Sequence, residues 1–417
     1  IGRLELKASD AKVRISAVHA IAKAIDEEGL TLLRDRLPIE NESAVQDEIR
    51  QVLALEDLNT TDKTSRLSAI ALLKNHATQD VVNRLNAWVE KDMDGNYVET
   101  DSDVRNQAKT ALVAINSKIS FYNGIETLFF GLSLGAVLVL AAIGLAITFG
   151  VMGVINMAHG ELMMLGAYTT YVIQQLMPGH LGLALILSIP AAFVVSGLVG
   201  IAIERGIIRF LYGRPLETLL ATFGVSLVLQ QTVRSIFSPL NRSVAAPDWM
   251  SGTWQINDFL SLTWNRFFIL IFCLLVFALL LHILKRTRLG LEVRAVAQNR
   301  NMAKAMGIPT AWVDAMTFGL GSGIAGIAGV ALSQITNVGP NLGQAYIVDS
   351  FMVVVFGGVG NLWGTLLAGF SLGIASKLLE PTAGAVLAKI LVLIFIILFI
   401  QKRPSGLFPQ KGRAVEG

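Results

Sequence analysis

Three polar side chains interrupt an otherwise apolar stretch at residues 153–168, which reads GVINMAHGELMMLGAY. They are Asn156, His159 and Glu161, and such groups are costly in lipid unless they face protein or water. Glycines at positions 150, 153, 160 and 166 predict a broken helix here. We therefore expect these residues to border a translocation pathway. The alternative is a loop at the end of a membrane span, in which Glu161 only stabilises a helix N-terminus.

A second interruption, VVFGGVGNLWG, lies at residues 354–364 in the other half of the apolar region. It contains Gly357, Gly358, Gly360 and one amide side chain, Asn361. Paired breaks in the two halves of a transporter sequence point to its substrate route. We therefore predict that these four residues line the same pathway.

The remaining reactive side chains predict neither catalysis nor a metal site. The histidines at positions 19, 76, 180 and 282 show no metal-ligand spacing, and the single cysteine, Cys273, allows no intrachain disulfide. The sequence contains no G-x-x-x-x-G-K-S/T loop, so we expect any ATP to bind another subunit. A G-x-G-x-x-G spelling at residues 321–326 follows no strand and fits close packing of membrane helices better. We expect a non-enzyme without metal or cofactor.

A basic, alanine-rich island at residues 286–309 separates two apolar runs. Its alanines favour a helix of about 15 residues, and Gly307 followed by Pro309 supplies a stop signal. The density of Lys and Arg marks the cytoplasmic side of a membrane. The segment is therefore either an ordinary positive loop or a surface helix that presses on a cytoplasmic partner, and its small-residue face favours the helix.

The composition predicts a polytopic, all-α membrane protein, because 53% of the residues are hydrophobic and only 16% are charged. About nine runs are candidate spans. They lie at residues 125–150, 162–176, 181–203, 219–237, 267–284, 312–335, 346–356, 362–379 and 385–400.

Residues 1–120 differ in composition, because charged residues alternate there with short amphipathic segments that begin near residues 10, 63 and 102. A repeat of this length with helical character predicts a HEAT-like α-solenoid. We therefore divide the chain into a solenoid domain at 1–120, a permease domain at 121–408 with its junction at 121–124, and a cytoplasmic tail at 409–417. The chain starts without an apolar leader, so we expect any signal peptide to have been removed or to lie outside this sequence.

The charge distribution predicts the topology. With the basic island inside, the loop of tryptophans at positions 249, 254 and 264 falls outside, and so do residues 1–120. The basic C-terminus is cytoplasmic if residues 346–356 are a true crossing.

Three segments carry a family resemblance: INMAHGELMMLGAY, RTRLGLEVRAVAQNRNMAKAMGI and VVFGGVGNLWGTLLAG. Over residues 125–408 the chain resembles permease subunits of branched-chain amino acid ABC importers. The preceding helical domain and the spelling MAHGELMMLGAYTTY make it most similar to the urea-uptake permeases of that family.

The resemblance implies a bacterial inner-membrane complex with a second, homologous permease, two cytoplasmic ATPases and a periplasmic substrate-binding protein, and without nucleic acid. Residues 289–306 would be the coupling helix in an ATPase groove. Its expected residues are Gly290, Arg294, Ala297, Asn299, Lys304 and Gly307.

The substrate implied by the resemblance is a small polar solute, with urea favoured and a branched-chain or other amino acid or amide as the alternative. A proton-coupled secondary transporter that uses Glu161, His159 or Asp349 is the alternative of another class. A structural membrane anchor for the solenoid is the third possibility. The family pattern does not extend to residues 1–120, so it implies no role for them.

Overall fold

The computed structural model describes residues 5–23, 26–76, 78–91 and 97–408. The predicted tail at 409–417 lies outside the described residues. The chain divides into two compact units, of which unit 1 comprises residues 1–125 with 255–261 and unit 2 comprises 126–254 with 262–417.

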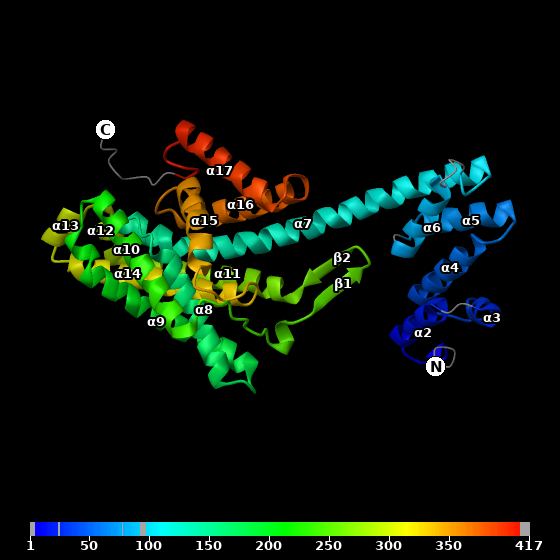
Figure 1. The fold of residues 1–417 in the computed structure, drawn as a ribbon, viewed down its shortest axis with the longest axis horizontal. Helices are drawn as coiled ribbons and strands as arrows, with labels where there is room; N and C mark the ends of the chain where they lie inside the picture. The colour runs from blue at the N-terminus through cyan, green and yellow to red at the C-terminus, as the bar shows by residue number, and fades with distance from the viewer. Residues whose placement is uncertain (1–4, 24–25, 77, 92–96, 409–417) are drawn as a thin grey trace. The chain divides into compact units, whose positions relative to one another are not determined.

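Unit 1 contains short helices (Figure 1). These helices bury two hydrophobic clusters. In one cluster, Val18, Leu33 and Ile49 meet from three helices; in the other, Ile70, Leu85 and Ile115 do so. Helix α4 (Ser43–Asp57) contributes to both clusters and joins them. The helices are α2 (Ala11–Lys23), α3 (Glu27–Arg36), α4 (Ser43–Asp57), α5 (Lys63–Leu73), α6 (Gln79–Val89) and the first part of α7 (Ser102–Met152).

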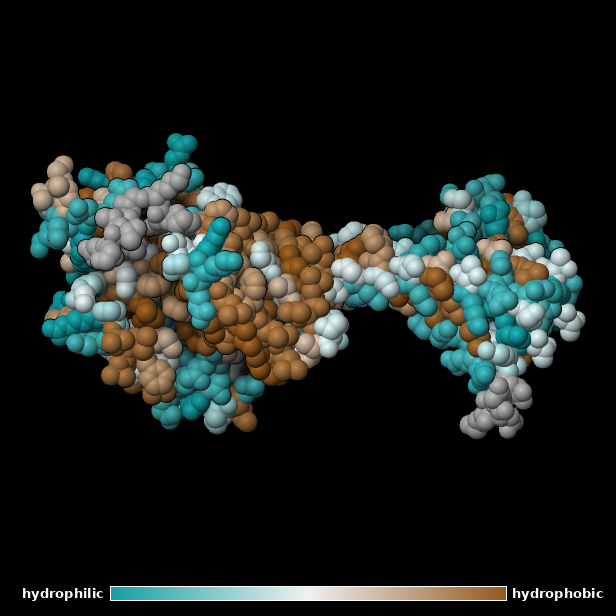
Figure 2. All heavy atoms as spheres, turned by 90° about the horizontal axis from the view of Figure 1, so that it is seen from above, coloured by the Kyte–Doolittle hydropathy of each residue, from teal (hydrophilic) through white to brown (hydrophobic). Residues whose placement is uncertain are grey.

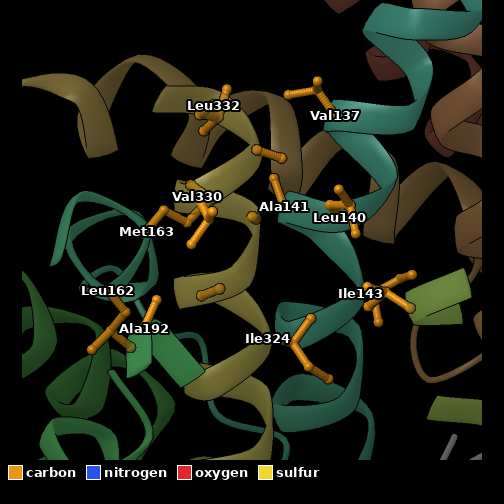
Figure 3. Close-up of a cluster of buried hydrophobic side chains, with 14 of the residues drawn as sticks. Val137, Leu140, Ala141, Ile143, Leu162, Met163, Ala192, Ile324, Val330 and Leu332 are labelled. Carbon is orange, nitrogen blue, oxygen red and sulfur yellow. The ribbon is translucent and has the colours of Figure 1, made fainter. Parts of the chain in front are cut away.

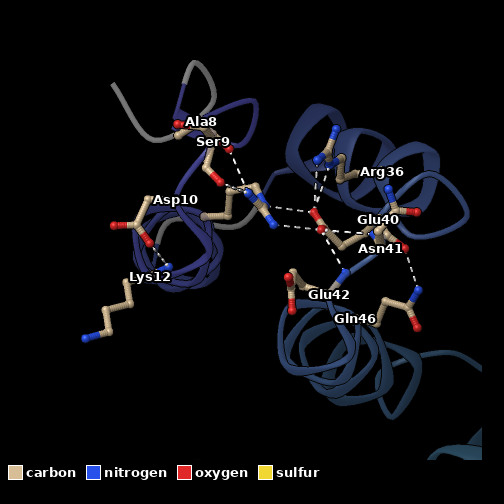
Figure 4. A network of polar contacts seen from close by, with 10 residues as sticks. Ala8, Ser9, Asp10, Lys12, Arg36, Glu40, Asn41, Glu42 and Gln46 are labelled. Carbon is tan, nitrogen blue, oxygen red and sulfur yellow. Dashed lines mark hydrogen bonds and ion pairs between the residues drawn. The ribbon is translucent and has the colours of Figure 1, made fainter.

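A buried carboxylate ties the first three helices of unit 1 together (Figure 4). Glu40 is 3% exposed; it accepts hydrogen bonds from Arg14 Nε at 3.0 Å, Arg14 Nη2 at 2.9 Å and Arg36 Nη2 at 2.9 Å. Burial raises the pKa of Glu40, but hydrogen bonds from the Glu42 backbone, Arg36 and Arg14 outweigh it and lower the pKa to about 2. The carboxylate is therefore fully paired and ionised.

Helix α7 continues without interruption through the predicted junction at 121–124 (Figure 1). Gly124 did not end the helix, because one glycine costs a helix only about 1 kcal/mol and no proline follows it. The change of environment therefore occurs within one helix of 51 residues.

Unit 2 contains one helix for each of the nine apolar runs. In the part of the chain that the structure describes, seven of these are long and apolar enough to cross a membrane. The other two are α8 (His159–Leu176), which carries polar groups, and α15 (Leu342–Gly357), which has 16 residues. The seven are α7, α9 (Leu181–Gly206), α10 (Pro215–Phe237), α11 (Trp264–Arg286), α14 (Thr310–Ser333), α16 (Leu362–Ala383) and α17 (Ala385–Lys402).

Helices α7, α8, α9 and α14 form the core of unit 2 (Figure 3). Leu140 of α7, Met163 of α8, Ala192 of α9 and Ile324 of α14 belong to one buried cluster. A Cβ at Gly329 would lie 1.9 Å from the Met163 oxygen, so only glycine permits this approach of α14 to α8. The glycines of α14 thus pack membrane helices closely, as the sequence predicts.

Hydrophobic residues cover much of the face of unit 2 that Figure 2 shows. On α17, Val386, Phe395 and Leu398 are all exposed. A helix that presents such side chains outward is suited to lipid rather than water.

The loop between α10 and α11 is not all-α as predicted. It contains the 3₁₀ helix η2 (Asp248–Met250) and a hairpin of β1 (Thr253–Asn257) and β2 (Leu260–Thr263), and η1 (Ile208–Phe210) follows α9. Trp254 and Trp264 stack at the hairpin base with ring centroids 5.8 Å apart. Trp264 is the first residue of α11, so this contact joins β1 to the start of that helix. The strands themselves are favoured by β-branched and aromatic residues such as Thr253, Trp254 and Ile256.

Candidate translocation site

The first predicted break is an irregular segment of unit 2 in which Val154, Asn156 and Ala158 are buried. Helix α7 ends at Met152, Gly153 adopts a φ of +66°, and α8 begins only at His159. Within the segment, Asn156 is 1% exposed and its Oδ1 accepts a hydrogen bond from the Ala158 N–H at 3.0 Å. Backbone without helical hydrogen bonds is tolerated at membrane depth only where protein or a water-filled cavity surrounds it.

The start of α8 lies beside the middle of the membrane part of α7. His159 Nε2 donates to the Ala141 carbonyl at 2.8 Å, and Ala141 precedes the end of α7 by 11 residues. At 1.5 Å per residue the chain has returned by about 16 Å along α7 before α8 begins. The observed break is therefore deep, unlike a loop at the end of a span.

Glu161 points toward α10 and is 1% exposed. Its Oε1 accepts hydrogen bonds from Ser226 Oγ at 3.1 Å and from Gln230 Nε2 at 2.7 Å. His159 bonds to α7 instead, so the two predicted pathway residues contact different helices. Glu161 does not cap its own helix by any hydrogen bond that the described residues show.

A polar stripe on α10, missed from the sequence, supports this break. Thr218, Thr222, Ser226 and Gln230 recur every four residues, and all four are buried. Thr222 Oγ1 accepts a hydrogen bond from the Met157 N–H at 3.1 Å and so holds the irregular backbone. Spacing of four residues in an apolar run places polar groups on one helix face, and this signal was available in the sequence.

The N-termini of α8 and α15 meet at the depth of this break. A Cβ on Gly160 would lie 2.4 Å from the Gly343 oxygen, and a Cβ on Gly343 would lie 2.4 Å from the Gly160 carbonyl carbon. The first turns of α8 and α15 are therefore in backbone contact, which brings two partially positive helix ends together. Short helices whose N-termini meet inside the bundle form the sites of many transporters.

Three polar atoms of this break have no hydrogen-bond partner among the described residues. They are Asn156 Nδ2, His159 Nδ1 and Glu161 Oε2, and each is buried. Because His159 Nε2 donates to a carbonyl, Nδ1 is a hydrogen-bond acceptor in neutral imidazole. One donor, one acceptor and one carboxylate oxygen thus remain for water or a polar solute.

The second predicted break lies elsewhere. A Cβ on Gly150 would lie 2.4 Å from Gly360, so this break is beside the end of α7, whereas His159 is beside Ala141. The nine residues from 141 to 150 correspond to about 13 Å along the helix. The structure therefore separates the two groups of predicted pathway residues along α7.

Residues 357–361 form a tight turn between α15 and α16. Gly358 and Gly360 have φ values of +101° and +82°, a region that favours glycine. Gly357 packs backbone to backbone against Gly364. Asn361 caps α16 by accepting from the Gly364 N–H at 3.1 Å.

The second break shares a cavity of about 700 Å³ with the predicted coupling segment. Gly360 and Asn361 line it together with Arg294 and Ala297. The cavity lies between α7, α11, α16 and the helix α12 (Arg288–Gln298). The structure thus brings half of the second group of pathway residues to the coupling segment and leaves Asn156, His159 and Glu161 apart.

The coupling segment is two helices rather than one. They are α12 (Arg288–Gln298) and α13 (Arg300–Ala305), separated at Asn299. Asn299 is extended, and its side chain accepts from the Met302 N–H at 2.9 Å, so it starts a second helix. Gly307 then ends the segment with a φ of +87°.

The first helix is held closely to the end of α11. Arg294 donates to the Leu284 carbonyl, and a Cβ on Gly290 would lie 2.2 Å from the same oxygen. Lys304, Met302 and Met306 are exposed, the last by 77%. One side of the segment is therefore fixed to unit 2 and the other is free for a partner.

An ion pair anchors the second helix. Arg300 bonds to both carboxylate oxygens of Asp314, which is fully buried in the second turn of α14. Burial lowers the pKa of Arg300, but the hydrogen bond and charge of Asp314 outweigh it and raise the pKa. The guanidinium also lies 4.6 Å from the Tyr212 ring, and Tyr212 Oη donates to Glu204 at 2.9 Å. These contacts link α13 to α14 through Asp314 and to α9 through Tyr212 and Glu204.

Known proteins match this part of the chain. The family described as "Branched-chain amino acid transport system / permease component" matches residues 127–400. The high-affinity branched-chain amino acid transport system permease protein LivH of Escherichia coli K12 is 31% identical over 293 residues, which cover 68% of this chain and 94% of that protein. BraD of Pseudomonas aeruginosa, described likewise, is 28% identical over 69% of this chain and 96% of its own length. No solved structure matches the chain.

The family match begins after residues 1–125 and covers the deep break, the coupling segment and the turn at 357–361. Relatives described as permeases fit the expectation of a non-enzyme. The chain belongs to the permease component family of branched-chain amino acid transport systems.

Proposed function

We propose that this chain is the permease subunit of an ATP-driven importer that carries branched-chain amino acids into a bacterial cell across the inner membrane. The observation that carries the proposal is the deep break at 153–161, where unpaired polar atoms lie inside an apolar bundle. The substrate follows the printed names of LivH and BraD. None of the named relatives is a urea permease, so we favour the amino acid over the urea that the sequence motifs suggested.

The proposed assembly contains a second permease subunit, two cytoplasmic ATPases and an extracytoplasmic binding protein. The coupling segment supports an ATPase partner, because its exposed Met302 and Met306 lie on and directly after α13, which Arg300 ties to Asp314. Substituting Gly290 would be a poor test, since any side chain there meets Leu284. Met306→Glu should instead reduce ATPase co-purification, while Leu240→Glu, equally exposed in another loop, should not.

We further propose that α12 and α13 are cytoplasmic and that unit 1 and the loop of tryptophans are extracytoplasmic. Five helices, α7 to α11, separate residues 1–101 from the coupling segment. The chain returns along α7 between Met152 and the start of α8, and this supports counting α8 as a full membrane crossing. Protease access to unit 1 only from the cytoplasm would overturn this topology.

The short helices of unit 1 support the proposal of a HEAT-like repeat that helps to receive the loaded binding protein. The alternative is a cap that stabilises the permease pair. Deleting residues 1–100 leaves α7 intact and should weaken receptor-stimulated ATP hydrolysis more than basal hydrolysis. Equal loss of both would favour the cap.

The substrate is tested with the complex isolated from its own membranes through a tag on this chain and placed in proteoliposomes. ATP and binding protein should drive uptake of leucine, isoleucine and valine. Uptake of urea alone would contradict the proposed substrate. Uptake by this chain alone, driven by a proton gradient, would contradict the ABC mechanism.

A further inference from the structure

Unit 2 contains a second polar cavity, lined by other residues than the deep break. A cavity of about 280 Å³ lies between α7, α11, α15, α16 and α17. Its lining includes five charged side chains in otherwise apolar helices, namely Arg266, Asp349, Lys377, Glu380 and Lys389. Ionisable groups within membrane helices commonly mark the path of a substrate or ion.

The cavity lies at the opposite end of unit 2 from the coupling segment. Arg266 is in the first turn of α11, and α12 follows the other end of α11 at Arg286. The 20 residues from 266 to 286 span about 30 Å. If the coupling segment is cytoplasmic, as proposed above, the cavity is on the side from which a binding protein delivers its solute.

The ion pairs among these five side chains include four of them and leave one cation, Arg266. Lys377 pairs with Glu380, and Lys389 Nζ lies 3.2 Å from Asp349 Oδ2. Among the described residues, no carboxylate is within ion-pair distance of Arg266, whose guanidinium lies 4.8 Å from the Phe130 ring. The Arg266 guanidinium is partly buried, and it can donate two parallel hydrogen bonds to a carboxylate.

The other wall of the cavity is aliphatic. Leu138, Val353, Leu372 and Val392 line it and belong to a buried hydrophobic cluster. Beside them, Ser133 is 1% exposed, and its Oγ has no hydrogen-bond partner in the described part of the chain. The cavity thus combines a charged rim, an aliphatic floor and one unsatisfied hydroxyl.

We propose that this cavity is an entrance site for a zwitterionic amino acid with an aliphatic side chain. Arg266 binds the carboxylate of the solute, and Asp349 exchanges Lys389 for the ammonium group of the solute. The aliphatic floor receives the side chain. Urea offers neither a charge for the rim nor a hydrocarbon for the floor. The inference rests on the proposed function and adds a binding site to it.

The test uses the complete complex and a cysteine reporter in the cavity. Ser376→Cys places a thiol in the lining, and Thr336→Cys is a second reporter on another element. Labelling of the reporter peptide by N-ethylmaleimide is followed by mass spectrometry, with leucine, leucinamide, 4-methylpentanoate or urea present. Cys273 is buried and lies in a separate peptide.

Leucine should slow labelling, and urea should not. Leucinamide lacks the carboxylate and should protect poorly. In Arg266→Gln, the leucine concentration that halves the labelling rate should rise at least about tenfold, as expected for loss of a charge-assisted hydrogen bond. Arg209→Gln is the matched control, because Arg209 also lies over a phenylalanine ring, Phe210 at 4.4 Å, but outside the cavity.

Two results would overturn the inference. One is that leucine does not slow the labelling of either reporter, and the other is that leucine protects the reporter in Arg266→Gln as well as in the parent complex. The proposed function is judged separately, by ATP-dependent leucine uptake of the unsubstituted complex. Absent uptake contradicts that function, whereas normal uptake without protection contradicts only the entrance site.

Discussion

Two buried glutamates, one in each unit, have opposite surroundings. Glu40 of unit 1 is bound by two arginines and by backbone N–H groups, so both of its oxygens are satisfied. Glu161 of unit 2 receives only neutral donors, and all of them bind Oε1. Its Oε2 has no partner among the described residues. A satisfied buried carboxylate holds helices together, whereas an unsatisfied one is costly to the fold and points to a function.

The largest expected effect follows from Glu161. Glu161→Gln keeps the shape of the side chain but removes its charge, and ATP-driven leucine uptake should fall about tenfold to a hundredfold, as expected for loss of a charge-assisted hydrogen bond. Assembly and the melting temperature of the complex should change little. The exposed Glu217 at the start of α10 gives the control, Glu217→Gln. Normal uptake by Glu161→Gln would remove the distinction between the two glutamates.

The next effect concerns Glu40. Glu40→Ala leaves two arginines without their carboxylate, and breaking a buried pair of this kind costs about 3 kcal/mol or more. Hydrogen exchange in the full chain should therefore accelerate in α2, α3 and α4 but not in unit 2. The exposed pair of Asp47 and Arg50 supplies a control, because Asp47→Ala should alter exchange little. Unchanged exchange in Glu40→Ala would show that the network is not structural.

The smallest effect is a pH dependence of the same contact. The pKa of Glu40 is lowered from 4.5 to about 2, so the folded state binds this proton less readily than the unfolded state does. The stabilisation is complete above pH 4.5 and declines as the pH falls toward 2. Exchange in α2, α3 and α4 should accelerate over this window, and Glu40→Gln should flatten the dependence. An equally steep profile in Glu40→Gln would assign it to other groups.

The sequence predicted the helices of unit 2 well, because a run of apolar residues long enough to span lipid has few alternatives to a helix. The predicted junction at 121–124 lies inside α7, close to the division between the units after residue 125. One helix boundary was predicted badly, because Asn299 was expected inside one helix but separates two. That boundary depends on contacts that are not local.

The candidate site was predictable only in part. Asn156, His159 and Glu161 stand out as polar residues in an apolar run, but their partners come from α7 and α10. The contact of Gly160 with Gly343 joins residues 183 positions apart, and no local pattern specifies it. The sequence shows that polar residues recur every four positions on α10. The role of this stripe, however, depends on the residues that it contacts in the folded chain.

The central claim is that the deep break borders the route of the solute, and the accessibility of position 156 tests it most directly. Asn156→Cys in the complex is treated with a small membrane-impermeant thiol reagent from either side, with and without nucleotide. The account predicts reaction from the extracytoplasmic side in one nucleotide state, slowed by leucine. Reaction only from the cytoplasm in every nucleotide state would contradict it and leave the segment as a loop at the end of α7.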